Sequence, residues 1–405
     1  MNTAIYTLTS SLHDAKAVDA TTHSFLDSLG IDYEYRGEDF ADYGTHPLDL
    51  IFVRTGGTEG LFKRLLVDLR QQSQRPIYLL TSGKSNSLAA SMEILSFLRQ
   101  HDIPGEILHG NPDYIRRRIH QLHAVGKAIR QLNHSRLGIV GQPSDWLISS
   151  TVDRVAVRQR LGIELIDIDL QTLIDAVPMI EPDVQDLNTF SQYVTDKNVQ
   201  LRSSLPDALR IYQGLRQLVD EHQLNGLTIR CFDLLTALHN TGCLALSRLN
   251  CEGLVAGCEG DIPAMLTMHI ARALTSCSGF QANPAFIDTE KGEVLLAHCT
   301  IPLDMLRRFE FDTHFESGIG VAIRGYMDEG PVTLFKVSGD LRRYFVAEGT
   351  LLRCDNRPDL CRTQVHVRLN DASQTQDFLT QPIGNHHILL PGHHRELIET
   401  FFKQC

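Results

Sequence analysis

The sequence predicts an α/β protein with two doubly wound parallel-sheet domains, followed by an antiparallel, β-rich C-terminal domain. Two observations support this fold class. Up to about residue 300, short β-rich runs alternate with helical patterns, which implies parallel pairing. Beyond that point strands follow one another with only turn signals between them, which is typical of an antiparallel unit such as a small barrel. We place the boundaries near residues 134 and 300, which gives domains at 1–134, 135–300 and 301–405.

The first domain contains four strand–helix pairs. Asp49–Thr55 (DLIFVRT) is the clearest strand, because an apolar run closed by Gly56 and Gly57 suits a strand buried on both faces. The expected strands are 3–9, 49–55, 76–81 and 105–108, and the expected helices are 13–29, 61–69, 87–99 and 112–132.

The second domain repeats this pattern, and the third does not. In the second, the expected strands are 137–142, 163–170 and 226–232, and the expected helices are 152–161, 205–224 and 262–274. In the third, strands are expected at 333–339, 344–353, 363–369 and 386–392, before a terminal helix at 395–403. No internal repeat, low-complexity tract or long linker interrupts the chain.

Composition excludes several classes of protein. A net charge of -11 argues against a nucleic-acid partner, which usually leaves a basic surface. No apolar run reaches the ~18 residues that a membrane span needs. The N-terminus lacks a basic segment followed by an apolar one, so we expect a cytoplasmic protein. The nine cysteines form no CxxC pair, which favours free thiols over a zinc ribbon or a redox motif.

The segment AGCEGD, at residues 256–261, follows a predicted buried strand and precedes a helix. Ligands bind at such carboxyl ends of parallel strands. Glu259 has only small neighbours, so its carboxylate must be solvated, paired or bound to a metal. An alternative stays open, in which Glu259 or Asp261 is the N-cap of the helix.

Asp288 and His298 end two short apolar runs in one compact region. A hairpin with its turn at Lys291 and Gly292 would bring the two runs together. The alternatives are a turn residue for Asp288 and a core histidine for His298.

His386 and His387 open the last strand. Adjacent strand residues face opposite sides, so only one of the two can point into a given site. Together with Glu259 and Asp288, one such histidine gives an oxygen-rich donor set that suits Mn²⁺, or Mg²⁺ or Co²⁺.

Two further residues are candidates for substrate binding. Arg54 opens the glycine-rich turn RTGGTEG, whose N–H groups could hold an anion, although a tight turn alone also explains the pattern. Trp146 is the only tryptophan, and in a loop it could stack on a sugar face or serve packing.

Four segments carry a resemblance to the L-fucose and L-arabinose isomerases. AGCEGD resembles the segment with their first metal carboxylate, PAFID the segment with their second, AHCTIP their Ala-His segment, and GNHHI their late histidine segment. The resemblance is strong over about 255–302 and only architectural before residue 250. It implies two Rossmann-like domains before a β-rich domain, Mn²⁺ held by two carboxylates and a histidine, and a trimer or hexamer.

The resemblance also implies aldose–ketose interconversion through an enediol. Glu259 and Asp288 would then be metal ligands and the acid and base that move a proton between C1 and C2. His298 would be a ligand or would contact a substrate hydroxyl. Our own hypothesis for the substrate is a five- or six-carbon aldose or deoxy-aldose, with an anionic group, where present, held by Arg54 and its glycine turn. The alternatives are a non-catalytic sugar-binding or regulatory relative, or a metal-dependent epimerase or aldolase.

Overall fold

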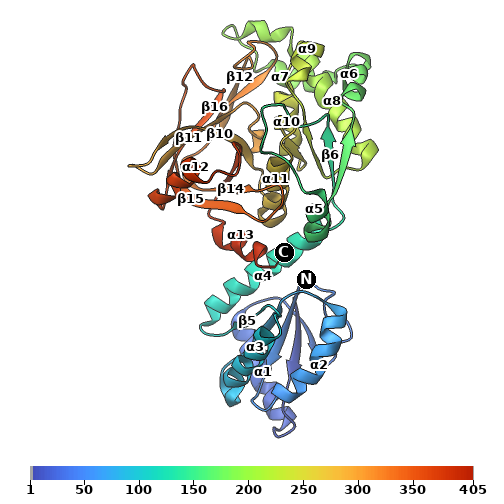
Figure 1. Cartoon of the computed structure of the whole chain (residues 1–405), viewed down its shortest axis with the longest axis vertical. Helices are drawn as coiled ribbons and strands as arrows, with labels where there is room; N and C mark the ends of the chain where they lie inside the picture. Colours follow the sequence, from blue (N-terminus) through green and yellow to red (C-terminus); the bar gives the residue numbers. More distant parts are fainter. Residues whose placement is uncertain (1–2, 405) are drawn as a thin grey trace. The chain divides into compact units, whose positions relative to one another are not determined.

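The computed structural model describes residues 3–404, apart from the side chains of residues 15–17. It divides into two compact units. Unit 1 comprises Met1–Arg130 with Glu399–Cys405, and unit 2 comprises Gln131–Ile398. In Figure 1 the strands of unit 1 are blue, and the strands of the barrel in unit 2 are mostly orange and red.

Unit 1 is built on a five-stranded parallel sheet in the order β2-β1-β3-β4-β5. Apolar side chains cover both of its faces and form two separate core clusters. This explains the continuous apolar run of the third strand, because a strand buried on both faces has no polar side. The strands are β1 (Thr3–Leu8), β2 (Glu34–Gly37), β3 (Leu48–Val53), β4 (Ile77–Leu80) and β5 (Gly105–Leu108). The helices are α1 (Ala15–Leu29), α2 (Glu59–Gln72), α3 (Ser87–Gln100) and α4 (Pro112–Leu132).

Unit 2 begins with a four-stranded parallel sheet in the order β7-β6-β8-β9. Its strands are β6 (Arg136–Val140), β7 (Glu164–Ile168), β8 (Gly226–Ile229) and β9 (Val255–Gly257). Its helices are α5 (Arg154–Leu161), α6 (Leu170–Ala176), α7 (Val184–Ser191), α8 (Leu205–His222), α9 (Asp233–Ala237), α10 (Cys243–Cys251) and α11 (Ile262–Thr275). Helix α11 packs against β8 and β9 on one side and against β14 and β17 of the barrel on another.

The rest of unit 2 is a closed antiparallel barrel in the order β10-β11-β16-β15-β14-β17. Its strands are β10 (Phe280–Asp288), β11 (Glu293–His298), β14 (Gly330–Val337), β15 (Tyr344–Cys354), β16 (Thr363–Leu369) and β17 (His387–Pro391). A separate hairpin joins β12 (Arg308–Asp312) to β13 (Ala322–Tyr326), and the short helix α12 (Asp377–Thr380) precedes the last strand. The chain ends in α13 (Arg395–Phe402).

The predicted fold class is confirmed, because two parallel sheets precede a closed antiparallel barrel. The barrel begins with β10 and β11, before residue 300, and the division of the chain into three domains stays a prediction. Strand β2 was not predicted, because it is a short edge strand whose only apolar residue is Tyr35. The hairpin of β12 and β13 was also missed, although Phe309 and Phe311 alternate with charged residues. No helix in the described part of the chain is long and apolar enough to cross a membrane.

Candidate active site and metal centre

Glu259 lies in the turn between β9 and α11, at the carboxyl end of the parallel sheet. Its backbone is left-handed, with φ of 63°, and its side chain is 7% exposed. Residues other than glycine rarely adopt this conformation, which costs of order 1–3 kcal/mol and is concentrated at functional sites. Asp261 is the N-cap of α11, because its carboxylate accepts a hydrogen bond of 2.8 Å from the N–H of Ala264. The capping role therefore belongs to Asp261, and the Glu259 carboxylate is available for chemistry.

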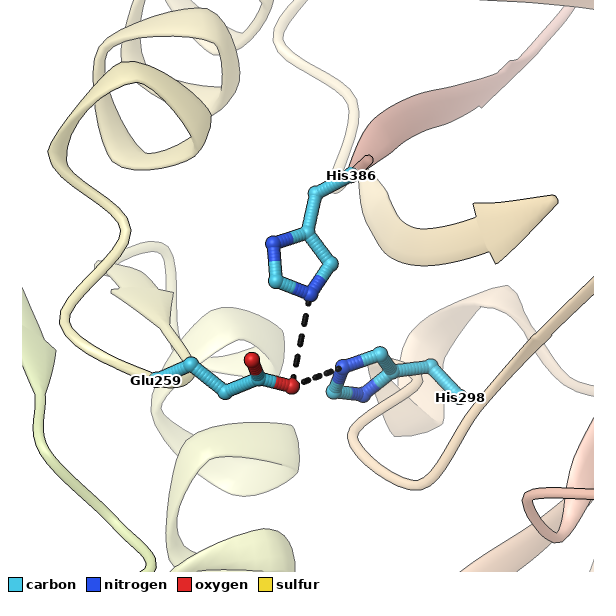
Figure 2. Close-up of side chains that lie close together, drawn as sticks. All are labelled: Glu259, His298 and His386. Atoms are coloured by element: carbon cyan, nitrogen blue, oxygen red, sulfur yellow. Dashed lines mark ion pairs between the residues drawn. The ribbon is translucent and has the colours of Figure 1, made fainter. Parts of the chain in front are cut away.

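Two histidines of the barrel region face this carboxylate (Figure 2). His298 ends β11, and His386 directly precedes β17. Their Nε2 atoms lie 3.5 Å and 3.4 Å from the same oxygen, Oε1 of Glu259. All three side chains are buried, and one ligand atom from each lies within 4.8 Å of the others. The fold thus brings together one residue after the parallel sheet and two from the barrel.

Each imidazole is oriented by a partner on its other nitrogen. Nδ1 of His298 lies 3.1 Å from Oγ1 of Thr300. Nδ1 of His386 lies 2.8 Å from Oδ2 of Asp261, so the helix cap also positions a histidine. A ring nitrogen held in this way directs the opposite nitrogen, here Nε2, toward the shared point beside Glu259.

Trp146 fixes the second oxygen of the carboxylate. Its indole N–H donates a hydrogen bond of 2.6 Å to Oε2 of Glu259. The ring packs edge-on against Phe232 with the centroids 4.8 Å apart, and the side chain remains 52% exposed. The proposed stacking of this ring on a sugar stays a prediction, whereas its contact with Glu259 is a role that the sequence did not indicate.

The electrostatic environment favours charged forms of these buried groups. Burial alone would raise the pKa of the Glu259 carboxyl, but its close contacts with the imidazoles of His298 and His386 outweigh burial and lower it. Burial would likewise raise the pKa of Asp261, yet the charge of Lys336 and the bond from His386 lower it to about 2. For His386, burial would lower the pKa, but the hydrogen bond with Asp261 and the nearby charge of Glu259 raise it to about 9.

The side chains of Glu259, His298 and His386, called the metal group below, fit a divalent cation. One carboxylate and two imidazoles are donors that first-row divalent metals accept. Nε2 of His386 is buried and makes no hydrogen bond with any described residue. Such a buried polar atom is costly unless something binds it. Nδ1 of His386 already contacts Asp261. A cation beside Glu259 would therefore satisfy the remaining nitrogen, Nε2.

A small cavity of about 60 Å³ adjoins the metal group. Glu259 and His298 line it together with Asn283, His314 and Glu316. Thiols form much of the remaining wall, from Cys231, Cys243, Cys258, Cys299 and Cys361. All eight described cysteines are free, as predicted, and Cys405 lies outside the described residues.

Asp288 does not join the metal group, so the expected convergence of Asp288 and Glu259 on one ion is not found. The predicted hairpin forms, and its register pairs Asp288 with Glu293 beside the turn, whereas His298 lies at the opposite end of β11. Oδ1 of Asp288 accepts hydrogen bonds from the N–H groups of Glu290 and Lys291, at 3.1 and 3.0 Å. Asp288 therefore acts as a turn residue, the alternative that the sequence left open.

His387 points away from Glu259, as strand alternation requires. It is buried against the rings of Phe345 and Phe378, and its Nδ1–H donates to the carbonyl oxygen of Asn385 at 3.1 Å. Burial lowers the pKa of His387 to about 3, so it is neutral. Of the two candidate histidines, His386 is the one that the structure brings to the metal group.

Arg54 belongs to unit 1, where acidic side chains balance its charge. The guanidinium pairs with Asp19, lies 3.9 Å from Glu38, and donates a hydrogen bond of 2.7 Å to the hydroxyl of Thr9. An anion held by Arg54 would have to compete with these carboxylates. The anion-binding role of this turn stays a prediction.

Sequence reasoning missed five residues around the site. They are Thr300, Lys336, Asn283, His314 and Glu316, while Asp261 was weighed only as a cap. The segment DTHFES, which contains His314 and Glu316, offered a signal in its density of polar residues within a β-rich region. Lys336 offered the opposite signal, because a lysine inside the apolar run TLFKV is unusual unless it is paired.

Comparison with known proteins gives matches to sugar isomerases. A family model described as the L-arabinose isomerase central domain matches residues 148–277. Proteins named sulfoquinovose isomerase from Priestia aryabhattai and from Priestia megaterium are each 27% identical over 313 residues, covering 72% of this chain and 67% of theirs. A sulfoquinovose isomerase from Alkalicoccus urumqiensis is 23% identical over 320 residues, covering 75% of this chain and 71% of its own. These matches indicate that the chain is an aldose–ketose isomerase.

Proposed function

We propose that this aldose–ketose isomerase depends on a divalent metal and interconverts a six-carbon aldose and its ketose through an enediol. One observation carries the proposal. Glu259, His298 and His386 converge in a buried group, and Nε2 of His386 lacks any described hydrogen-bond partner. This geometry resembles an open metal site more than a structural ion pair, because a structural pair satisfies its buried nitrogens.

Glu259, His298 and His386 would hold the cation, which would be Mn²⁺, Mg²⁺ or Co²⁺. When bound, such a cation polarises the substrate carbonyl and makes the adjacent C–H more acidic. Other residues of the protein hold these three ligands in position. Thr300 and Asp261 hold the two imidazoles, and Trp146 holds the Glu259 carboxylate through Oε2.

Isomerisation transfers one proton between carbons. In the direction from aldose to ketose, a base removes the proton from C2 and an acid returns a proton to C1, while a hydroxyl proton moves from O2 to O1. We assign the first role to Glu259. Glu316 is the other carboxylate among the described residues that line the small cavity, and we assign the second role to it in place of Asp288.

The substrate follows from the relatives. Three of them are named for sulfoquinovose, a hexose that carries a sulfonate group. We infer that this chain accepts an aldose of the same size. Product analysis distinguishes the alternatives, because an epimerase would return an aldose and an aldolase would release shorter fragments.

The decisive experiment is Glu259→Gln. This change preserves the shape of the side chain but removes its charge, so we expect metal content to fall and ketose formation to drop by several orders of magnitude. Glu310→Gln is the matched control, since Glu310 is an exposed carboxylate of β12. A Glu259→Gln enzyme that keeps both its metal and its activity would contradict the proposal.

Asp288→Asn tests the corrected position of the second carboxylate. A turn residue should lose of order 1 kcal/mol of stability with little change in rate. Glu316→Gln should instead slow isomerisation about a hundredfold, the usual contribution of a proton-transfer group. The opposite ranking of the two variants would return the second role to Asp288.

A further inference from the structure

A second, larger cavity lies beside the metal group. Its volume is about 640 Å³. Trp146, which donates to Glu259, lines it, and so does Asn385, the neighbour of His386. A substrate whose carbonyl end reached Glu259 could therefore extend into this space.

Lys336 supplies the central observation. It lies on β14, in the wall of this cavity, and its side chain is only 1% exposed. Its Nζ is 3.5 Å from Oδ2 of Asp261 and makes no hydrogen bond with any described residue. An ammonium group has three N–H donors, and leaving them unused inside a protein is costly. An acceptor from a ligand in the cavity would use them.

Gly384 lies next to this ammonium group. Its φ is +82°, and a Cβ placed on it would lie 4.0 Å from Nζ of Lys336 and 3.9 Å from Oγ of Ser149. A side chain at position 384 would thus occupy a point in van der Waals contact with both donors. The absence of a side chain keeps that point available to a ligand.

The charge of the cavity wall selects for anions. Its lining contains Lys336 and Arg343 and, among the described residues, no aspartate or glutamate. Arg343 is exposed in the turn between β14 and β15, and no carboxylate pairs with its guanidinium among the described residues. Asp261 lies 3.5 Å from Lys336 but does not line the cavity, and no described carboxylate pairs with Arg343, so the wall attracts a negative ligand although the chain has a net charge of -11.

We propose that this cavity binds the oxyanion of an acidic sugar, with Lys336, Ser149 and Arg343 as its donors. The inference rests on the proposed isomerase function and names its substrate class, an aldose with an anionic group remote from the carbonyl. A sulfonate, a phosphate and a carboxylate share the required chemistry. Pro263, Ile287 and Phe378 in the same wall would cover the apolar face of the sugar.

Kinetics on matched sugars test the proposal. The substrates are glucose, glucose 6-sulfonate, glucose 6-phosphate and glucuronate, and the variant is Arg343→Ala. Loss of a charge-assisted hydrogen bond should raise KM for the preferred anionic sugar about tenfold or more and leave the constants for glucose unchanged. The ranking of the three acidic sugars identifies the oxyanion.

Arg342→Ala is the matched control. Arg342 is the exposed neighbour of Arg343, it carries the same charge, and it lies near Asp340 instead of lining the cavity. Equal effects of the two variants on acidic and neutral sugars would overturn the proposal. Lys336→Met provides a second test, with metal content and thermal unfolding measured alongside, because loss of its contact with Asp261 could also disturb His386.

Calorimetric binding of glucose 6-sulfonate separates this inference from the isomerase proposal. A protein that forms no ketose from any sugar, yet binds this compound and loses affinity in Arg343→Ala, would support the anion site and refute the isomerase. A protein that isomerises glucose and glucose 6-sulfonate with equal efficiency in every variant would support the isomerase and refute the anion site.

Discussion

The hydroxyl of Thr300 contacts a proposed metal ligand, His298, without itself belonging to the metal group. Its Oγ1 contacts Nδ1 of His298 at 3.1 Å, and the side chain is 3% exposed. Such outer contacts set the orientation and basicity of a ligand imidazole. We expect Thr300→Val, which keeps the shape of the side chain, to weaken Mn²⁺ binding about 10- to 100-fold in a calorimetric titration.

Thr375→Val is the control for that variant. Thr375 is equally buried, and its hydroxyl donates a single hydrogen bond of 2.6 Å to the carbonyl of Ala372. Both variants should lose about 1 kcal/mol of stability. Metal affinity should change only in Thr300→Val, and a similar loss in both would indicate a general effect of unfolding.

His387 predicts a specific acid sensitivity. Burial lowers its pKa in the folded protein to about 3, below the ordinary value of 6.5. Between these values the unfolded chain binds a proton that the folded chain does not, so this group's contribution to stability is complete above pH 6.5 and is lost as the pH falls toward 3. His387→Phe removes this dependence.

Urea unfolding in the presence of a chelator measures this pH dependence of stability. Relative to wild type, His387→Phe should be less stable at pH 7.5, because the carbonyl of Asn385 loses its donor. The deficit should shrink by up to about 1.4 kcal/mol per pH unit below pH 6.5. Parallel stability profiles for the two proteins would contradict the neutral, buried assignment of His387.

The turn between β9 and α11 is the element on which the site depends most. Gly260 follows Glu259 with φ of +67°, and a Cβ on it would lie 2.6 Å from the carbonyl oxygen of Gln142. Gly260→Ala should therefore displace the turn, destabilise the protein by roughly 2–4 kcal/mol and lower metal content.

Gly318→Ala isolates the part of that effect that comes from backbone conformation alone. Gly318 has almost the same conformation, with φ of +70°, but nothing lies within 4 Å of its added Cβ. Its replacement should cost only about 1 kcal/mol, the penalty for a left-handed backbone. Thermal unfolding and metal analysis of both variants provide the measurement, and equal losses would show that close packing at Gly260 is unimportant.

The elements also show what sequence patterns can and cannot predict. Strands such as Leu48–Val53 were predictable, because burial on both faces leaves an apolar run closed by glycines. Alternation in a strand correctly implied that only one of His386 and His387 would face the site. The hairpin of β10 and β11 was also predicted, but which of its ends faces Glu259 depends on how the barrel closes, and so Asp288 was misplaced.

Contacts between distant elements lay beyond sequence reasoning. Asp261 on the N-terminus of α11 meets Lys336 on β14 and His386 before β17, and these three residues are far apart in the chain. No local pattern encodes such a meeting, because it arises when α11 packs against the barrel. The same holds for Trp146 and Glu259, whose hydrogen bond joins two loops of unit 2.

At the scale of the whole molecule, the family resemblance implies a trimer or a hexamer, and light scattering at micromolar concentration would test this. Ile148 is 89% exposed. It is the chain neighbour of Ser149, which lines the larger cavity. If subunits meet there, Ile148→Asp should shift the assembly toward the monomer, because a charge would be buried in the interface. A wild-type protein that is already a stable monomer would refute the expected assembly.

The whole chain of 405 residues contains a single tryptophan, and its indole N–H contacts Glu259. The protein therefore carries a built-in fluorescent reporter at its site. Light that tyrosine does not absorb would excite Trp146 alone, and its emission would respond to any change at the carboxylate. Paramagnetic Mn²⁺ should quench this emission while Mg²⁺ should not, so cation occupancy could be followed optically in real time, without any label.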